Sequence, residues 1–191
     1  MLQRRRRWRA QPFGHKQQKS LPLNQIDKLL RSLAQTPGCS LLPPQGLPTL
    51  PADVQLPDDL RAFYERAGGA VLYADHVCAG HQRVLGPSEV KRVDQVITGE
   101  RFATGPFPWW YAIVDVRDGN YVAIDLNPEH HGLCYDAFHE TFATPGYVSV
   151  IAGSFSDLLA RLLNHQEDSS YWLQEGFKPL GEAFALYGYT E

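Results

Sequence analysis

The chain has 191 residues, of which 43% are hydrophobic and 20% are charged, so it can bury a core of ordinary size and does not belong to the intrinsically disordered class. It contains no run of about 18 apolar residues, the length that a membrane-spanning helix requires. Its three cysteines, Cys39, Cys78 and Cys134, form no Cys-x-x-Cys pair. Neither a disulfide framework nor a zinc knuckle is therefore indicated, and we predict a reducing, cytoplasmic location.

The first 22 residues are predicted to form a flexible basic arm. Residues 1–20 contain seven basic residues and no acidic one, and they lack the apolar stretch of an export signal. Subtracting these seven from the 18 basic residues leaves 11 basic against 21 acidic residues in 21–191, a net charge of −10. An acidic body repels nucleic acid and membranes, so we expect neither as a partner.

Helical periodicity appears three times in the first hundred residues. Apolar residues recur at helical spacing over 24–35 and again over 57–67, and each stripe predicts an amphipathic helix. Six prolines within 36–57 exclude a helix or a central strand there and predict a loop. A short strand is predicted at 70–73, and a further helix over 88–99.

The centre of the chain is predicted to be an antiparallel meander. The runs 111–116 and 120–126 are rich in β-branched and aromatic residues, and Asp118-Gly119 between them is the strongest short signal for a hairpin. A third strand is predicted at 133–138. Alternation in the second run indicates a sheet with one packed face and one polar face.

A last amphipathic helix is predicted to begin at Ser154 or Ser156 and to cover the sheet. Helices before and after the strands, rather than between them, indicate an α+β fold with the helices packed on one face of a mainly antiparallel sheet. Residues 168–191 are too aromatic for a disordered tail. We therefore predict a C-terminal extension that packs on a domain spanning 23–167.

The order of these features resembles the SUKH superfamily, which includes fungal cell-wall-assembly regulators and bacterial toxin-immunity proteins. The resemblance covers roughly residues 55–165, and its motifs are generic singly but specific in their order and spacing. They are Leu56-Pro57, Leu60 to Phe63-Tyr64, Gly68-Gly69, Trp110 to Asp125 with Asp118-Gly119 and Ile124-Asp125-Leu126, Gly132, Ser154-Phe155 and Leu158-Leu159.

The resemblance implies an α+β protein-binding module that catalyses nothing. Bacterial relatives neutralise a cognate toxin, often a nuclease, whereas fungal relatives act as signalling scaffolds. We therefore predict an immunity protein that binds a basic toxin, because an acidic body suits a groove built to attract phosphate. A regulatory scaffold is the alternative, and an unrecognised metal-dependent enzyme is the third hypothesis.

Metal, cofactor and catalytic sites are not predicted. The possible metal donors are His76, Cys78 and His81, and then Glu129, His130, His131, Cys134, His139 and Glu140. They show none of the short regular pair spacings of structural zinc sites. The chain also lacks a GxSxG motif and a glycine-rich phosphate loop, so we expect no cofactor and no catalytic residue.

The predicted partner-binding residues are acids beside the strands of the meander and two tryptophans before it. They are Asp115, Asp118, Asp125, Glu129, Asp136 and Glu140, together with Trp109 and Trp110. We expect several of the acids to project together as a rigid platform for a basic groove, although Asp125 has the alternative role of capping a turn. The tryptophans are either core anchors, which the usual burial of large aromatics favours, or an exposed binding patch.

Overall fold

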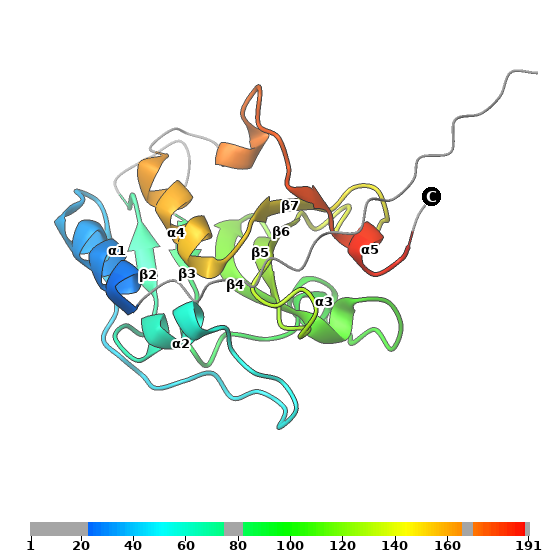
Figure 1. Ribbon diagram of the computed structural model, residues 1–191, viewed down its shortest axis with the longest axis horizontal. Helices are drawn as coiled ribbons and strands as arrows, with labels where there is room; N and C mark the ends of the chain where they lie inside the picture. The colour runs from blue at the N-terminus through cyan, green and yellow to red at the C-terminus, as the bar shows by residue number, and fades with distance from the viewer. Residues whose placement is uncertain (1–22, 75–81, 166–169, 190–191) are drawn as a thin grey trace, which may run out of the picture.

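The computed structural model describes residues 23–74, 82–165 and 170–189, and within them it contains one eight-stranded sheet and five α-helices. Each strand pairs antiparallel with the next one along the chain, so the sheet is a continuous meander (Figure 1). The strands are β1 Ser40–Leu41, β2 Ala70–Leu72, β3 Gln82–Val84, β4 Trp110–Arg117, β5 Asn120–Asp125, β6 Cys134–Ala137, β7 Ser149–Ala152 and β8 Gly181–Glu182. The predicted α+β class and antiparallel meander are confirmed.

The helices are α1 Leu23–Gln35, α2 Asp58–Tyr64, α3 Val93–Thr98, α4 Phe155–Asn164 and α5 Ala183–Leu186, with 3₁₀ turns η1 Phe107–Trp109 and η2 Tyr171–Leu173. Of the two possible caps of α4, Ser154 is the N-cap, because its side chain accepts a hydrogen bond from the Asp157 amide. No helix in the described ranges is both long enough and apolar enough to cross a membrane.

Two predicted elements differ from the structure. The helix expected over 88–99 is confined to α3, because residues 91 and 92 bond to β4: the Ala112 amide donates to the Lys91 carbonyl, and Arg92 forms a β-bridge with Tyr111. The loop expected over 36–57 contains β1. This strand lies at the edge of the sheet, where neighbouring prolines are tolerated.

The β4–β5 hairpin closes through the predicted two-residue turn. Asp118 and Gly119 have φ angles of 52° and 76°, and Arg117 pairs with Asn120 on either side of them. Positive φ at both central positions is the requirement of the turn that matches the twist of a hairpin. The predicted turn is confirmed.

The three longest of the described helices pack on one face of the sheet, as predicted, and the second face is also buried. Helices α1, α2 and α4 cover one face, where the core is mainly aliphatic, while α3 and α5 cover the other, where the core is rich in aromatic side chains and is called the aromatic core below. The alternation in β5 was misleading because Ala123, expected on the polar face, is buried against Trp110 and Tyr135 of the aromatic core.

The last described segment, 170–189, contributes to both cores. Tyr171 and Trp172 belong to the aliphatic core, and the Tyr171 hydroxyl donates to the Ile151 carbonyl at 2.9 Å. Strand β8 then pairs with β7, and Phe184 enters the aromatic core. This segment therefore supplies the covering layer that the sheet needs on its second face.

Candidate functional site

An open hollow of about 290 Å³ lies where the proline-rich loop, the segment leading into α3 and the start of β4 meet. Its lining residues are Thr49, Pro51, Asp53 and Val54 from the loop, Val90, Lys91, Arg92 and Gln95 around the start of α3, Arg101 after it, and Pro108, Trp109 and Tyr111 from the start of β4. Three of these side chains are cationic, and Asp53 is the one acid among the described residues that line it.

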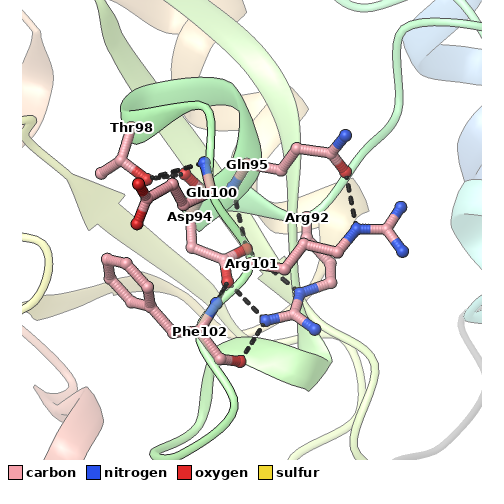
Figure 2. A network of polar contacts seen from close by, with 7 residues as sticks. All are labelled: Arg92, Asp94, Gln95, Thr98, Glu100, Arg101 and Phe102. Carbon is pink, nitrogen blue, oxygen red and sulfur yellow. Dashed lines mark hydrogen bonds and ion pairs between the residues drawn. The ribbon is translucent and has the colours of Figure 1, made fainter.

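A buried carboxylate, that of Asp94, connects residues that line the hollow to the loop after α3 (Figure 2). Asp94 is 0% exposed and accepts hydrogen bonds from the Gln95 amide at 2.9 Å and the Phe102 amide at 2.6 Å. Arg92 donates through Nε to the same carboxylate at 3.1 Å, and its Nη2 contacts both the carboxylate and the Phe102 carbonyl. These hydrogen bonds connect the loop after α3 to the helix and hold the Arg92 guanidinium in place.

The other two cations are exposed. Arg101 donates through Nε to the Gln95 side chain at 3.0 Å, and its terminal nitrogens point away from the other residues drawn in Figure 2. Lys91 is exposed beside it in the lining. Burial raises the pKa of the Tyr111 phenol, and the charges of Arg92 and Arg101 oppose that rise, as expected for cations close to the same hollow.

The two tryptophans have different roles. Trp110 is 0% exposed and lies in the aromatic core, with ring centroids 4.9 Å from Tyr135 and 5.2 Å from Phe184. A partner cannot reach it, so its predicted place in the interface was wrong and the core-anchor interpretation holds. Trp109 is half-buried and lines the hollow, so it remains available for binding.

Asp125 is also wrong as a partner contact, because it is 0% exposed. Its carboxylate accepts hydrogen bonds from the Tyr135 hydroxyl at 2.6 Å, from the Tyr187 hydroxyl at 2.7 and 2.8 Å, and from the Asn127 amide at 2.9 Å. Burial raises the pKa of Asp125, and these hydrogen bonds counteract part of the rise. The alternative role, capping the turn after β5, is the one that the structure shows.

The remaining acids do not form one platform. Asp118 and Glu140 are exposed at the end of the sheet where β5 begins, since the His139 amide bonds to Asn120 at 3.1 Å. Glu129 is exposed at the other end, beyond the six residues of β5. At about 3.3 Å per residue, the two ends are about 20 Å apart. The prediction of a single cluster was therefore wrong.

Asp115 and Asp136 lie on opposite faces of the sheet. Asp115 is 3.5 Å from Arg83 in an ion pair, whereas Asp136 is partly buried and bonds to the Trp172 side chain. Burial raises the pKa of Asp136 to about 6. Neither side chain joins the exposed acids into a larger patch.

Several residues considered in the sequence lie outside the described part of the chain. They are the basic arm, 1–22, and His76, Cys78 and His81. Within the ranges that the structure describes, no group of three or more His, Cys, Asp and Glu side chains is placed to hold a metal ion.

The hollow was missed by reasoning from sequence alone. One weak signal for it was present, because residues 83–101 contain four basic and three acidic residues, a net charge of +1 in an otherwise acidic body. Such a local excess of positive charge does not show which of the side chains face a common space. That information required the packing of the proline-rich loop against the start of β4.

Comparison with known proteins adds two findings. A family model described as the SMI1 / KNR4 family (SUKH-1) matches residues 52–161. Immunity protein YokJ of Bacillus subtilis (strain 168) is 37% identical over 161 residues, which cover 83% of this chain and 95% of that protein. The matched family residues include most of the lining of the hollow.

Proposed function

We propose, from the premise that this chain belongs to the SMI1/KNR4 (SUKH-1) family, that it is an immunity protein that neutralises a cognate toxin by binding it directly. The observation that carries the proposal is the similarity to a protein named as an immunity protein, which extends over 95% of that protein. On this proposal the chain acts by occupying the toxin and not by catalysis, in the cytoplasm, where the toxin would otherwise act.

A rigid, prebuilt surface supports this function, because an inhibitor that is already ordered loses little entropy on binding. The eight-stranded sheet is covered on both faces, and the Asp94 network fixes the border of the hollow. We propose two contact regions at opposite ends of the sheet. One is the acidic end, with Asp118 and Glu140, and the other is the hollow, with Trp109.

The proposed partner is basic. The body of the chain has a net charge of −10, and complementary charge accelerates the encounter of two proteins by steering them together. A nuclease toxin fits this description, since its groove attracts phosphate. Growth rescue and binding can be measured whichever activity the toxin has.

The test is coexpression with a toxin domain encoded directly upstream of this chain, the gene order that an immunity protein should have. We expect the full chain to restore growth of bacteria that express the toxin, and the two purified proteins to bind in calorimetry. Growth that stays arrested while the chain is soluble, or calorimetry without binding, would contradict the proposal. Recovery of several unrelated partners without rescue would instead favour the regulatory scaffold.

The acidic end is tested by removing its charge without changing its shape. Asp118→Asn keeps a residue that accepts positive φ, and Glu140→Gln keeps the side-chain length. We expect the double variant to associate with the toxin about tenfold more slowly at low salt, with the difference disappearing at high salt. Glu65→Gln with Glu175→Gln is the matched control, because both acids are exposed elsewhere. Equal association rates for the two double variants would move the interface away from this end.

A further inference from the structure

The hollow has the opposite charge to the body that surrounds it. Lys91, Arg92 and Arg101 line it against one acid, Asp53, whereas residues 21–191 as a whole have a net charge of −10. The charge of Arg92 is balanced by the buried Asp94 below it. The excess of positive charge therefore comes from Lys91 and Arg101.

The side chains of the hollow are arranged before any partner binds. Gln95 holds one nitrogen of the Arg101 guanidinium, which leaves its terminal nitrogens for a ligand (Figure 2). Trp109 is half-buried and packs against the aromatic core. The Arg101 guanidinium is already oriented by one hydrogen bond, and Trp109 is already packed against the core. Both side chains therefore lose less conformational entropy on binding than unconstrained side chains would, and more of the contact energy appears as affinity.

The size and lining of the hollow limit what can enter it. Its volume, about 290 Å³, is at or below the lower limit of about 300–1,000 Å³ for sites that enclose small molecules. Val54, Val90 and Trp109 supply apolar wall beside the cations. This combination fits one anionic group on a short apolar stem, which is the chemistry of an aspartate or glutamate side chain.

We propose that the hollow is the anchor site for a single acidic side chain of the toxin, with Arg101 and Lys91 binding its carboxylate and Trp109 packing against its stem. This inference rests on the proposed function. It gives the interface two opposite charges about 20 Å apart, so that a basic toxin surface can dock at the acidic end in only one orientation.

The first experiment uses peptides and does not depend on the toxin. The full chain, labelled with ¹⁵N, is titrated with blocked tripeptides Ala-Glu-Ala, Ala-Gln-Ala and Ala-Lys-Ala while the indole N–H signal of Trp109 is followed. We expect the glutamate peptide to shift this signal with a dissociation constant on the order of millimolar, as for one small anchor. The glutamine and lysine peptides should bind at least tenfold more weakly, and Arg101→Gln should abolish the difference.

Two outcomes of the titration would overturn the inference. Equal shifts with the glutamate and glutamine peptides would show that the carboxylate is not recognised. Tighter binding of inorganic phosphate than of the glutamate peptide would identify a site for small anions and not an anchor for a protein side chain.

The second experiment uses the toxin. Lys91→Glu with Arg101→Glu should weaken toxin binding at least tenfold, while Arg31→Glu, an exposed cation on α1, should leave it unchanged. A melting curve for each variant shows whether it is folded, and Arg101→Gln replaces the double variant if that one is not. If the unaltered chain does not bind the toxin, the proposed function fails and the peptide titration still decides the inference. If Lys91→Glu with Arg101→Glu, like the control Arg31→Glu, binds the toxin as tightly as the unaltered chain does, the inference fails and the proposed function stands.

Discussion

Asp94 and Asp125 are both fully buried on the aromatic side of the sheet, but their negative charges are compensated in different ways. Asp94 faces the guanidinium of Arg92 and two backbone amides. Asp125 accepts hydrogen bonds from the hydroxyls of Tyr135 and Tyr187 and from one backbone amide, and the His130 imidazole lies 3.8 Å from its carboxylate. A buried charge needs a counter-charge or several hydrogen bonds: Asp94 has both, with Arg92 in direct hydrogen-bond contact, whereas Asp125 has hydrogen bonds from hydroxyls and an amide.

The difference shows what each carboxylate does for the proposed interface. The ion pair at Asp94 keeps a cation in the wall of the hollow and fixes the backbone of its border. The hydrogen bonds at Asp125 connect the end of β5 to Tyr187, and so hold the C-terminal segment over the sheet. We therefore expect changes around Asp125 and Asp136, whose pKa values are raised by burial, to depend on pH.

The largest effect is expected for Asp94→Ala. This change leaves the Arg92 guanidinium without its carboxylate and the amides of Gln95 and Phe102 without their acceptor. Breaking a buried pair in this way costs about 3–5 kcal/mol of the free energy of unfolding, measurable as a lower urea midpoint. Glu100→Ala is the control, since Glu100 is exposed in the adjoining loop and should change stability by less than about 0.5 kcal/mol. Similar midpoints for the two variants would show that the Asp94 network carries no stability.

The second largest effect is a gain in the free energy of unfolding, and it concerns Asp136, whose carboxylate accepts from a neutral donor, the Trp172 side chain. Burial raises its pKa from 3.8 to about 6, so the folded state binds more protons than the unfolded state between these values, and stability falls as the pH rises through them. Asp136→Asn removes this loss while its amide oxygen can still accept from Trp172. We expect the variant to gain up to about 2–3 kcal/mol at pH 7 and nothing at pH 3.

Urea titrations at several pH values between 3 and 7 measure this difference. A constant difference between Asp136→Asn and the unaltered chain over that range would mean that the carboxylate does not titrate as its burial indicates.

A smaller effect is expected for Tyr187→Phe, which removes one of the donors to Asp125. Loss of a hydrogen bond to a buried charge costs about 1.5–3 kcal/mol, and Asp125 keeps its other donors, so we expect the lower end of this range. Because the lost bond favours the charged carboxylate, the pKa of Asp125 rises further, so the cost should be greater at pH 7 than at pH 4. Thermal melting at both pH values measures this cost. Tyr189→Phe is the control, because Tyr189 is 45% exposed. Equal shifts for the two variants would remove Tyr187 from the network.

The aliphatic side of the sheet was predictable because its signals are local. Helices α1 and α4 follow from apolar residues at helical spacing, and the hairpin follows from Asp118-Gly119, two adjacent residues that accept positive φ. Each of these features needs only one window of sequence. Their positions in the structure agree with the expected ones to within a few residues.

The aromatic side and the hollow were not predictable because they depend on distant segments. Asp125 has the polarity of a solvent-facing residue, and its contact with Tyr187, 62 residues later, is one of those that allow its burial. Periodicity cannot report such a partner. The hollow likewise needs the proline-rich loop, the start of α3 and the start of β4 to meet. The charge of Arg101 was visible in the sequence, but not the space that it faces.

The smallest effect on stability is expected at Arg101, and it separates the two kinds of cation in the hollow. Arg101 is exposed and has one hydrogen bond, to Gln95, so Arg101→Gln should change the free energy of unfolding by less than about 0.5 kcal/mol. Arg92→Gln should cost about 2–4 kcal/mol, because it leaves the buried Asp94 without its counter-charge. Urea midpoints of the two variants measure the contrast. A large loss at Arg101 would mean that this side chain supports the fold, and weakened binding by its variants could then no longer be assigned to a lost contact with a carboxylate.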